Sequence, residues 1–381
     1  MKWEKVKLGD IATFSNGINF NKTAYAKGIK LIGVSNFGDR FYPDYSQLQE
    51  VKKDIVRLED CLRNGDIVFV RSNGNKELVG RCMLVKNPTE RVTYSGFCIR
   101  ARLNDTDRYD PVYFTYYFKS KAFRRAVSGT AVGANIQNLS QARLSNHECR
   151  IPSIEVQHSI ADILSAYDDL IENNQKQIKL LEEVAQRLYK EWFVDLNFPG
   201  HENTKIVDGV PEGWSRGLLK ELISVNYGKD HKKAPDDGNI PVYGSGGLMR
   251  KCNKSLFSGE AVLIPRKGSL NNIMYVDETF WTVDTMFYAT MKQPHTAVFV
   301  YFFVKAFDMY SMNIGAAVPS MTTKILDAMD VVIPDKETLE KFDKLTKTYF
   351  NKIKTLQGQN ERLKIARDLL LPKLMSGEVE V

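Results

Sequence analysis

Two short stretches of the sequence combine side chains that can hydrogen-bond to nucleic-acid bases with side chains that can bind phosphate. Both follow an apolar run, in GDIVFVRSNGNK (65–76) and in GEAVLIPRKGSLNN (259–272). Arginine can donate two hydrogen bonds to guanine and asparagine can pair with adenine, whereas lysine and serine contact phosphate. The candidate DNA-binding residues are Arg71, Ser72, Asn73, Asn75 and Lys76 in the first stretch, and Arg266, Lys267, Ser269, Asn271 and Asn272 in the second.

Two further loops, 34–40 and 242–245, also follow apolar runs and occupy corresponding early positions. They add Ser35, Asn36, Arg40, Tyr243 and Ser245 to the candidate DNA-binding residues. Polar loops are the ordinary surface of a protein, so a solvated side chain without a ligand is the alternative for each residue. For Tyr243 that alternative, a tyrosine at the edge of the core, is favoured. The aromatic runs 113–118 and 299–303 have helical spacing, which predicts core packing and not a stacking platform for bases.

No motif for catalysis is present. The glycine cluster YGSGG (243–247) lacks the lysine and hydroxyl of a phosphate-binding loop and predicts a turn. DPVY (110–113) departs at its third position from the Asn/Asp-Pro-Pro-Tyr/Phe motif of base methylation, and the Pro-Asp pairs lack the partner residues of a nuclease. The five cysteines are scattered without a CxxC pair, and the five histidines lack the spacing of metal ligands. The residues therefore predict a binding protein without a catalytic residue or metal site.

The two candidate loops belong to an internal repeat. WEKVKLGDI (3–11) resembles GWSRGLLKELI (213–223), and the aromatic run 109–123 resembles 294–307. Both halves then close with a stretch of small residues, GTAVGANIQNLS (129–140) or GAAVPSMTTKIL (315–326), followed by an Ile-Pro pair and a segment almost free of glycine and proline. A repeated segment order predicts a repeated architecture.

The segments 157–195 and 339–371 are predicted to be long helices with heptad seams. The seam residues are Leu164, Tyr167, Ile171, Asn174, Ile178, Leu181 and Leu188 in the first helix, and Leu345, Tyr349, Ile353, Leu356, Asn360, Leu363 and Leu370 in the second. The two seams are expected to pair antiparallel. We hypothesise that Asn174 and Asn360 hydrogen-bond across the seam and set its register, with two unrelated exposed asparagines as the alternative. Pro372 is expected to bend or end the second helix.

The predicted fold class is α+β, with two tandem globular domains of mixed α/β structure, each followed by a long helix. The predicted boundaries are 1–152 for the first globular domain, 153–198 for the central helix, 199–334 for the second globular domain and 335–381 for the distal helix. The two helices are expected to form an antiparallel coiled coil with pseudo-twofold symmetry.

The charge distribution favours a polyanionic partner. The net charge is +7, and a count by segment places about +9 in residues 1–155 and about 0 in residues 201–334. No run of eighteen apolar residues is present, and the charged start lacks the apolar core of a signal peptide. We therefore expect a cytoplasmic protein.

Several segments resemble a known family. QHSIADILSAYDDLIENN (157–174) and LYKEWFVD (188–195) are similar to the central conserved region of type I restriction-modification specificity (S) subunits. GVPEGW (209–214) resembles the opening of their second target-recognition domain. GAAVPS (315–320) and LLPKLMSG (370–377) resemble their distal conserved region. The first hinge lacks the Val-Pro-Ser of the second.

The resemblance implies a non-catalytic, sequence-specific subunit that binds double-stranded DNA with a bipartite target. Each target-recognition domain would read one half, and the helices would set the spacer. Modification (methyltransferase) subunits carrying S-adenosylmethionine would dock at the helices, and a restriction (translocase/endonuclease) subunit would join them; this chain would hold no cofactor itself. The alternatives are a specificity subunit of a related type II enzyme, a coiled-coil adaptor without sequence preference, or a single-chain enzyme with a degraded motif.

Overall fold

The chain folds into two compact units that share its two long helices. A computed structural model describes residues 3–38, 40–75, 78–127, 137–312 and 320–381. Unit 1 comprises Met1–Asn174 and Gly358–Val381, and unit 2 comprises Gln175–Gln357. The helices are α5 (Ile154–Tyr189), which continues into a π-helical turn (Lys190–Val194), and α8 (Lys336–Ser376). Each unit therefore contains one part of α5 and one part of α8.

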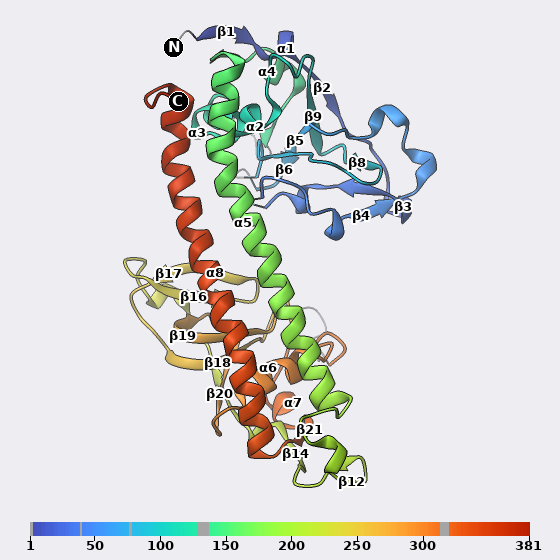
Figure 1. Cartoon of the computed structure of the whole chain (residues 1–381), viewed down its shortest axis with the longest axis vertical. Coiled ribbons are helices and arrows are strands. Elements are labelled where there is room, and N and C mark those ends of the chain that lie inside the picture. Colours follow the sequence, from blue (N-terminus) through green and yellow to red (C-terminus); the bar gives the residue numbers. More distant parts are fainter. Residues whose placement is uncertain (1–2, 39, 76–77, 128–136, 313–319) are drawn as a thin grey trace. The chain divides into compact units, whose positions relative to one another are not determined.

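Unit 1 is built around a sheet with the strand order β2-β9-β5-β7 and a second sheet with the order β4-β3-β8. Its first and last strands, β1 and β11, pair antiparallel, and α2 packs into the same core as the N-terminal part of α5 (Figure 1). The elements are β1 (Glu4–Lys7), α1 (Leu8–Ile11), β2 (Ala12–Asn16), β3 (Tyr25–Ile32), β4 (Gln49–Val51), β5 (Ile67–Val70), β6 (Ser72–Asn73), β7 (Cys82–Leu84), β8 (Val92–Tyr94), β9 (Cys98–Leu103), α2 (Pro111–Lys119), α3 (Lys121–Val127), β10 (Gln137–Asn138), α4 (Gln141–Ser145) and β11 (Glu148–Ile151).

Unit 2 contains one six-stranded sheet with the order β15-β20-β18-β19-β16-β17. Strands β14 and β21 pair antiparallel beside it. The elements are β12 (Ile206–Val207), β13 (Val210–Pro211), β14 (Ser215–Leu218), β15 (Ile223–Tyr227), β16 (Ile240–Gly244), β17 (Gly247–Cys252), β18 (Phe257–Pro265), β19 (Met274–Thr282), β20 (Met286–Met291), α6 (Ala297–Lys305), α7 (Thr323–Asp327) and β21 (Asp330–Ile333).

The strand orders confirm the internal repeat. The order β2-β9-β5-β7 in unit 1 is matched by β15-β20-β18-β19 in unit 2. In unit 1, β3 pairs parallel with β8 and antiparallel with β4; in unit 2, β16 pairs parallel with β19 and antiparallel with β17. The aromatic helices α2 and α6 are also equivalent, and their aromatic residues are mostly buried, as their helical spacing predicts.

The central strand of each sheet is buried on both faces. In β5, Ile67 and Phe69 belong to one hydrophobic core, while Val68 and Val70 belong to another. Strand β18 divides its side chains between two cores in the same alternating way, because successive side chains of a strand point to opposite faces. A strand held from both faces provides a fixed support for the loop that follows it.

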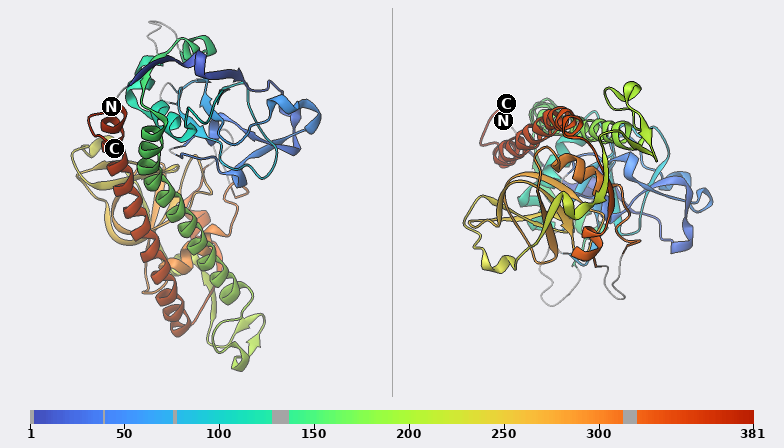
Figure 2. Two further views of the ribbon diagram at one scale, coloured as in Figure 1. Left: turned by 45° about the horizontal axis from the view of Figure 1, so that its top comes forward. Right: turned by 90° about the horizontal axis from the view of Figure 1, so that it is seen from below.

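The two long helices run side by side with the N-terminal part of α5 against the C-terminal part of α8 in unit 1 (Figures 1 and 2). Within this unit Arg367 forms an ion pair with Asp168. The Asn174 amide nitrogen donates a 2.9 Å hydrogen bond to the Asn360 amide oxygen. From Asp168 to Asn174 the residue numbers rise along α5, while those of the α8 residues that they contact fall from Arg367 to Asn360, so the two helices are antiparallel. The hypothesised hydrogen bond between Asn174 and Asn360 is present.

In unit 2 the C-terminal part of α5 and the π-helical turn that continues it pack on the N-terminal part of α8. The Phe342 ring lies 4.8 Å from the Phe193 ring and 5.8 Å from the Trp192 ring, measured between centroids. The same arrangement of globular part and two helix parts therefore occurs in each unit. None of the helices in the described ranges is long and apolar enough to cross a membrane.

Burial along the helices agrees with most of the predicted seam. Leu164, Ile171, Asn174, Ile353, Leu356 and Asn360 are buried, and Tyr167, Ile178, Leu181, Leu188, Tyr349, Leu363 and Leu370 are partly buried. The prediction is wrong for Leu345, which is 44% exposed, because Phe342 and Thr346 occupy the buried side there. Pro372 does not end α8, which continues to Ser376.

A buried carboxylate on a long helix contacts the globular part of each unit. In unit 1, the Tyr116 hydroxyl donates a 2.6 Å hydrogen bond to Asp168, whose other oxygen pairs with Arg367. In unit 2, His295 Nδ1 lies 2.7 Å and Lys347 Nζ lies 3.1 Å from the Asp343 carboxylate. A buried charge requires such partners, so these contacts fix where each globular part meets its helices.

We expect Asn174→Leu to destabilise the chain by about 1–3 kcal/mol, because the buried Asn360 amide loses its partner. The measurement is the urea midpoint of the full chain. Asn174→Leu with Asn360→Leu should recover most of the loss, since both polar groups are then replaced. The matched control is Asn173→Leu, on the exposed neighbouring position; an equal effect of the two single changes would contradict the role of the pair.

Candidate nucleic-acid interface

The predicted arginines Arg71 and Arg266 occupy equivalent positions in the two units. Each follows the doubly buried central strand, and each donates its backbone N–H to a carbonyl 2.8 Å away, of Phe97 in unit 1 and of Thr285 in unit 2. Their side chains also match: Arg71 Nη1 donates to the Gly96 carbonyl at 3.2 Å, and Arg266 Nη1 donates to the Asp284 carbonyl at 3.4 Å. One guanidinium nitrogen is therefore held by the backbone in both units.

The described part of each repeated hinge stretch holds the arginine loop from its other side. The Arg71 carbonyl accepts from the Leu139 N–H at 2.9 Å, and the Arg266 carbonyl accepts from the Met321 N–H at 2.9 Å. Strands β6 and β10 pair next to Arg71, and an isolated bridge joins Lys267 to Ser320. Residues 129–136 and 315–319 of the hinge stretches, and the candidate Lys76, lie outside the described residues.

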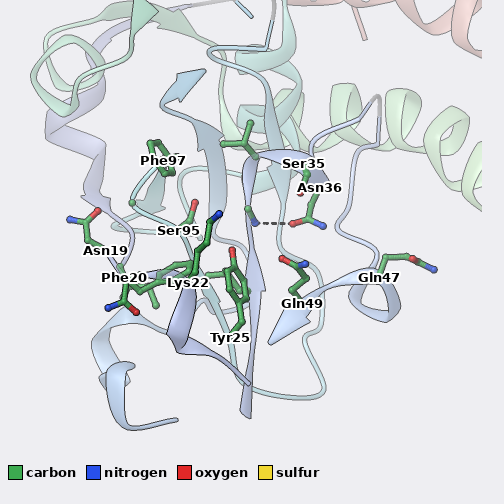
Figure 3. Close-up of a pocket in the computed structure, with 16 residues that line it drawn as sticks. Asn19, Phe20, Lys22, Tyr25, Ser35, Asn36, Gln47, Gln49, Ser95 and Phe97 are labelled. Carbon is green, nitrogen blue, oxygen red and sulfur yellow. Dashed lines mark hydrogen bonds between the residues drawn. The ribbon is translucent and has the colours of Figure 1, made fainter. Parts of the chain in front are cut away.

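A pocket of about 510 Å³ opens beside the Arg71 loop in unit 1 (Figure 3). Its wall includes the turn Ser95–Phe97, whose carbonyls accept from Arg71. Phe97 and Asn19 lie on one side of the pocket, and Ser35, Asn36 and Gln49 lie on the other, with Lys22, Ser95 and Tyr25 between them (Figure 3). The predicted candidates Ser35 and Asn36 are thus brought to the same surface as Arg71.

The polar lining of this pocket is rich in amides and contains a single charged side chain. The lining residues are Ile18, Asn19, Phe20, Asn21, Lys22, Tyr25, Leu31, Gly33, Val34, Ser35, Asn36, Gln47, Gln49, Ser95, Gly96 and Phe97. Five of these are Asn or Gln, one is Lys, and none is Asp or Glu. The Phe97 ring is 64% exposed at the rim. Amide donors and acceptors with an exposed aromatic ring are the chemistry of base recognition.

Close approach of the backbone requires glycine at a strand end beside the pocket, and the same requirement recurs in unit 2. A Cβ at Gly17 would lie 2.2 Å from the Tyr94 carbonyl oxygen, and a Cβ at Gly228, its counterpart in unit 2, would lie 1.9 Å from the Val283 carbonyl oxygen. A Cβ at Gly96 would lie 2.0 Å from the Asn19 side-chain oxygen. Side chains cannot approach backbone so closely, so the two strand ends require glycine.

In unit 2 the turn between β16 and β17 meets the Arg266 loop. The Asn272 amide donates to the Ser245 carbonyl at 2.9 Å. Asn271 is engaged inside the unit, because its amide donates to Asp308 at 2.9 Å and accepts from the Met309 N–H at 2.8 Å. The glycine cluster 243–247 forms this turn, as predicted.

Several candidates have internal partners in the structure. The Tyr243 hydroxyl donates to Glu278 at 2.5 Å, and burial, followed by this hydrogen bond, raises the pKa of Tyr243 above its ordinary value. Arg40 pairs with Asp44 at 3.0 Å, and the Asn36 oxygen accepts from the Gly33 N–H at 2.8 Å. Ser72, Asn73 and Asn75 stay on the Arg71 loop, and Lys267 and Ser269 are exposed on the Arg266 loop. DNA contact by all these residues stays a prediction.

The sequence reasoning missed the part of the pocket contributed by Asn19, Lys22, Gln47, Gln49 and Phe97. The stretch GINFNK (17–22) carried a signal, since it places two asparagines and a lysine after a glycine at a strand end. Gln47, Gln49 and Phe97 carried none, because they join the site only through the pairing of β3 with β4 and β8. The described residues contain no group of three or more His, Cys, Asp or Glu placed to bind a metal ion.

The family of the chain is shown by comparison with known proteins. The model for the type I restriction modification DNA specificity domain matches residues 1–183 and again residues 211–364. The chain belongs to this family, with one match in each repeat.

Among its relatives is the type I restriction enzyme MjaIX specificity subunit of Methanocaldococcus jannaschii. That protein is 26% identical over 344 residues, which cover 80% of this chain and 76% of the relative. The HindI specificity subunit of Haemophilus influenzae is 23% identical over an alignment that covers 99% of both proteins. The crystal structure of the S subunit from M. genitalium has the same fold, with a TM-score of 0.58 and 18% identity over 98% of this chain and 96% of that one.

We expect Gly17→Ala to distort the pocket and lower the thermal midpoint of the full chain, because the added methyl group meets backbone that cannot rotate away. Near-ultraviolet circular dichroism should change with it, since Tyr94 carries the clashing carbonyl. Gly38→Ala is the control, as nothing lies within 4 Å of a Cβ there. Equal midpoints for the two variants would show that the strand end can move.

Proposed function

We propose that this chain is the DNA specificity subunit of a type I restriction-modification enzyme and that each unit reads one half of a bipartite target. The observation that carries the proposal is the recurrence of the same arginine-bearing strand end in both units of a chain from this family. A doubly buried strand followed by a polar loop provides a rigid support with a variable reading surface. Two such supports in one chain suit a target with two separate parts.

The arginines are proposed to contact base edges. A guanidinium has five N–H donors, and one Nη of Arg71 and of Arg266 is already bound to a backbone carbonyl. The remaining donors can form the paired hydrogen bonds that select guanine. Lys267 and Ser269 are exposed nearby and are proposed to contact phosphate, which adds affinity without sequence information.

The catalytic work is proposed to belong to partner subunits. A modification subunit would carry S-adenosylmethionine, and a restriction subunit would join it for cleavage. The long helices carry exposed apolar residues away from their seam, which would suit docking of the modification subunits. They are Leu170, Ile365 and Leu369 in unit 1, and Leu180, Val184 and Leu345 in unit 2.

The helices are proposed to set the number of unread base pairs between the half-sites. Both helices continue across the border between the units, at residues 174–175 in α5 and 357–358 in α8. A continuous helix changes length only in fixed steps of about 1.5 Å per residue. A related type II enzyme that uses a separate specificity subunit would employ the same design, but all the relatives compared above belong to type I systems.

We expect Arg71→Ala to relax base selection in one half of the target and Arg266→Ala to relax it in the other half. Each lost guanine contact should reduce discrimination by about 1–3 kcal/mol. The measurement is selection from a random duplex pool by the chain bound to its modification subunit, followed by sequencing. Loss of selection in both halves from one substitution would contradict separate reading, and retention of DNA without any motif would favour the adaptor alternative.

We expect four residues inserted between Asn174 and Gln175 in α5 to change the spacer while both half-site sequences stay the same. Four helical residues add about 6 Å, close to two base pairs at about 3.4 Å each. A second variant carries this insertion together with four residues inserted between Gln357 and Gly358 in α8, so that both helices are lengthened equally and the seam keeps its pairing. The same selection experiment gives the spacer; an altered half-site sequence would contradict the proposed role of the helices.

A further inference from the structure

We propose that the amide pocket of unit 1 receives the edge of an adenine–thymine base pair, with Gln49 as the residue that selects the adenine. This inference rests on the proposed function, because it assigns one base position within the half-site that unit 1 reads. It concerns residues that lie outside the Arg71 loop in sequence. The pocket combines segments 18–25, 31–36, 47–49 and 95–97.

The location of the pocket supports contact with the same DNA segment as Arg71. The backbone N–H groups of Arg71 and Ser72 both point to the Phe97 carbonyl, at 2.8 and 3.4 Å, and the Arg71 side chain binds the Gly96 carbonyl. The pocket wall and the arginine loop are therefore parts of one hydrogen-bonded surface. A duplex that contacts the Arg71 guanidinium lies next to the pocket opening, where Phe97 is exposed.

The chemistry of the pocket favours a base over a phosphate. Phosphate binding needs positive charge, and Lys22 is the single cationic residue of the lining. The lining has no Asp or Glu either, so it suits neither a cation nor a ligand recognised through carboxylates. Amides that both donate and accept hydrogen bonds match the mixed donor and acceptor edge of a base.

Gln49 has an amide that is available to a ligand. Its side chain is exposed at the start of β4 and forms no hydrogen bond with any residue the structure describes. Figure 3 shows it on the same side of the pocket as Asn36, whose oxygen is held by the Gly33 N–H, so that the Asn36 NH₂ group remains as a donor. A glutamine amide can accept from adenine N6 and donate to adenine N7 together, which no other base permits in the same way.

The aromatic residues of the lining match the thymine of the proposed base pair. Tyr25 and Phe97 are large aromatic residues of the lining, with 45% and 64% of their surface accessible. The Tyr25 ring is fixed by an edge contact with Phe20, at 5.4 Å between centroids. Thymine presents a methyl group beside the adenine in the major groove, and an aromatic ring at the rim gives that methyl an apolar surface.

The test uses Gln49→Glu in the full chain, bound to its modification subunit and selected against a random duplex pool. Glutamate has the same shape but only accepts hydrogen bonds, which favours cytosine N4 over adenine. Arg71→Ala identifies which half-site belongs to unit 1. We expect one position of that half-site to change from adenine to cytosine, with adenine discrimination reduced about tenfold.

The matched control is Asn104→Asp, which makes the same amide-to-carboxylate change on an exposed residue next to the opposite end of β9 from Phe97. Selection of an unchanged sequence in the half-site read by unit 2 shows that each variant has folded and assembled. If the unchanged protein selects no bipartite motif, the proposed function fails and the inference fails with it. If it selects one, and Gln49→Glu leaves every position unaltered or has the same effect as Asn104→Asp, only the assignment of the pocket is overturned.

Discussion

The long helices must bury each other's seams, and the rest of the structure depends on this requirement. A buried seam that includes the amide pair Asn174–Asn360 tolerates few alignments, because a shifted alignment leaves polar groups without partners in the core. The globular parts join the helices through buried carboxylates, Asp168 in unit 1 and Asp343 in unit 2. The position of each globular part along its helices therefore follows from side-chain pairing.

The two arginine loops have the same backbone contacts but different surroundings. The backbone contacts of Arg71 recur at Arg266, and the strand before each is fixed between two cores. The surroundings differ, since a pocket rich in amides lies beside Arg71 in unit 1, whereas in unit 2 the Asn272 amide of the Arg266 loop donates to Ser245 in the turn 244–247. One scaffold can thus present different chemistry in its two copies, because loop residues outside the cores carry little of the stability.

The sequence predicted the features that depend on local periodicity or on repetition. The heptad spacing identified the seam and its asparagines, and comparison of the halves identified the two arginine loops. The heptad spacing placed Leu345 in the seam wrongly, because the buried side of α8 shifts to Phe342 where the globular part of unit 2 packs against this helix. The pocket could not be foreseen, because Asn36, Gln49 and Phe97 meet only through strand pairings between distant segments. Gly17, which lies beside the pocket, is required because the Tyr94 carbonyl approaches it closely, and no spacing rule reveals this contact.

The shared helices also determine when each unit can be completed during synthesis. Leu164 of unit 1 lies in a core that includes Leu371 and Leu374, near the end of the chain. The ribosome must first make the 183 residues of unit 2, Gln175–Gln357. At about 5–20 residues per second, this takes roughly 10–40 seconds. Throughout that interval the α5 seam of unit 1 has no helix against it, so the part of the protein made first is the last to finish folding.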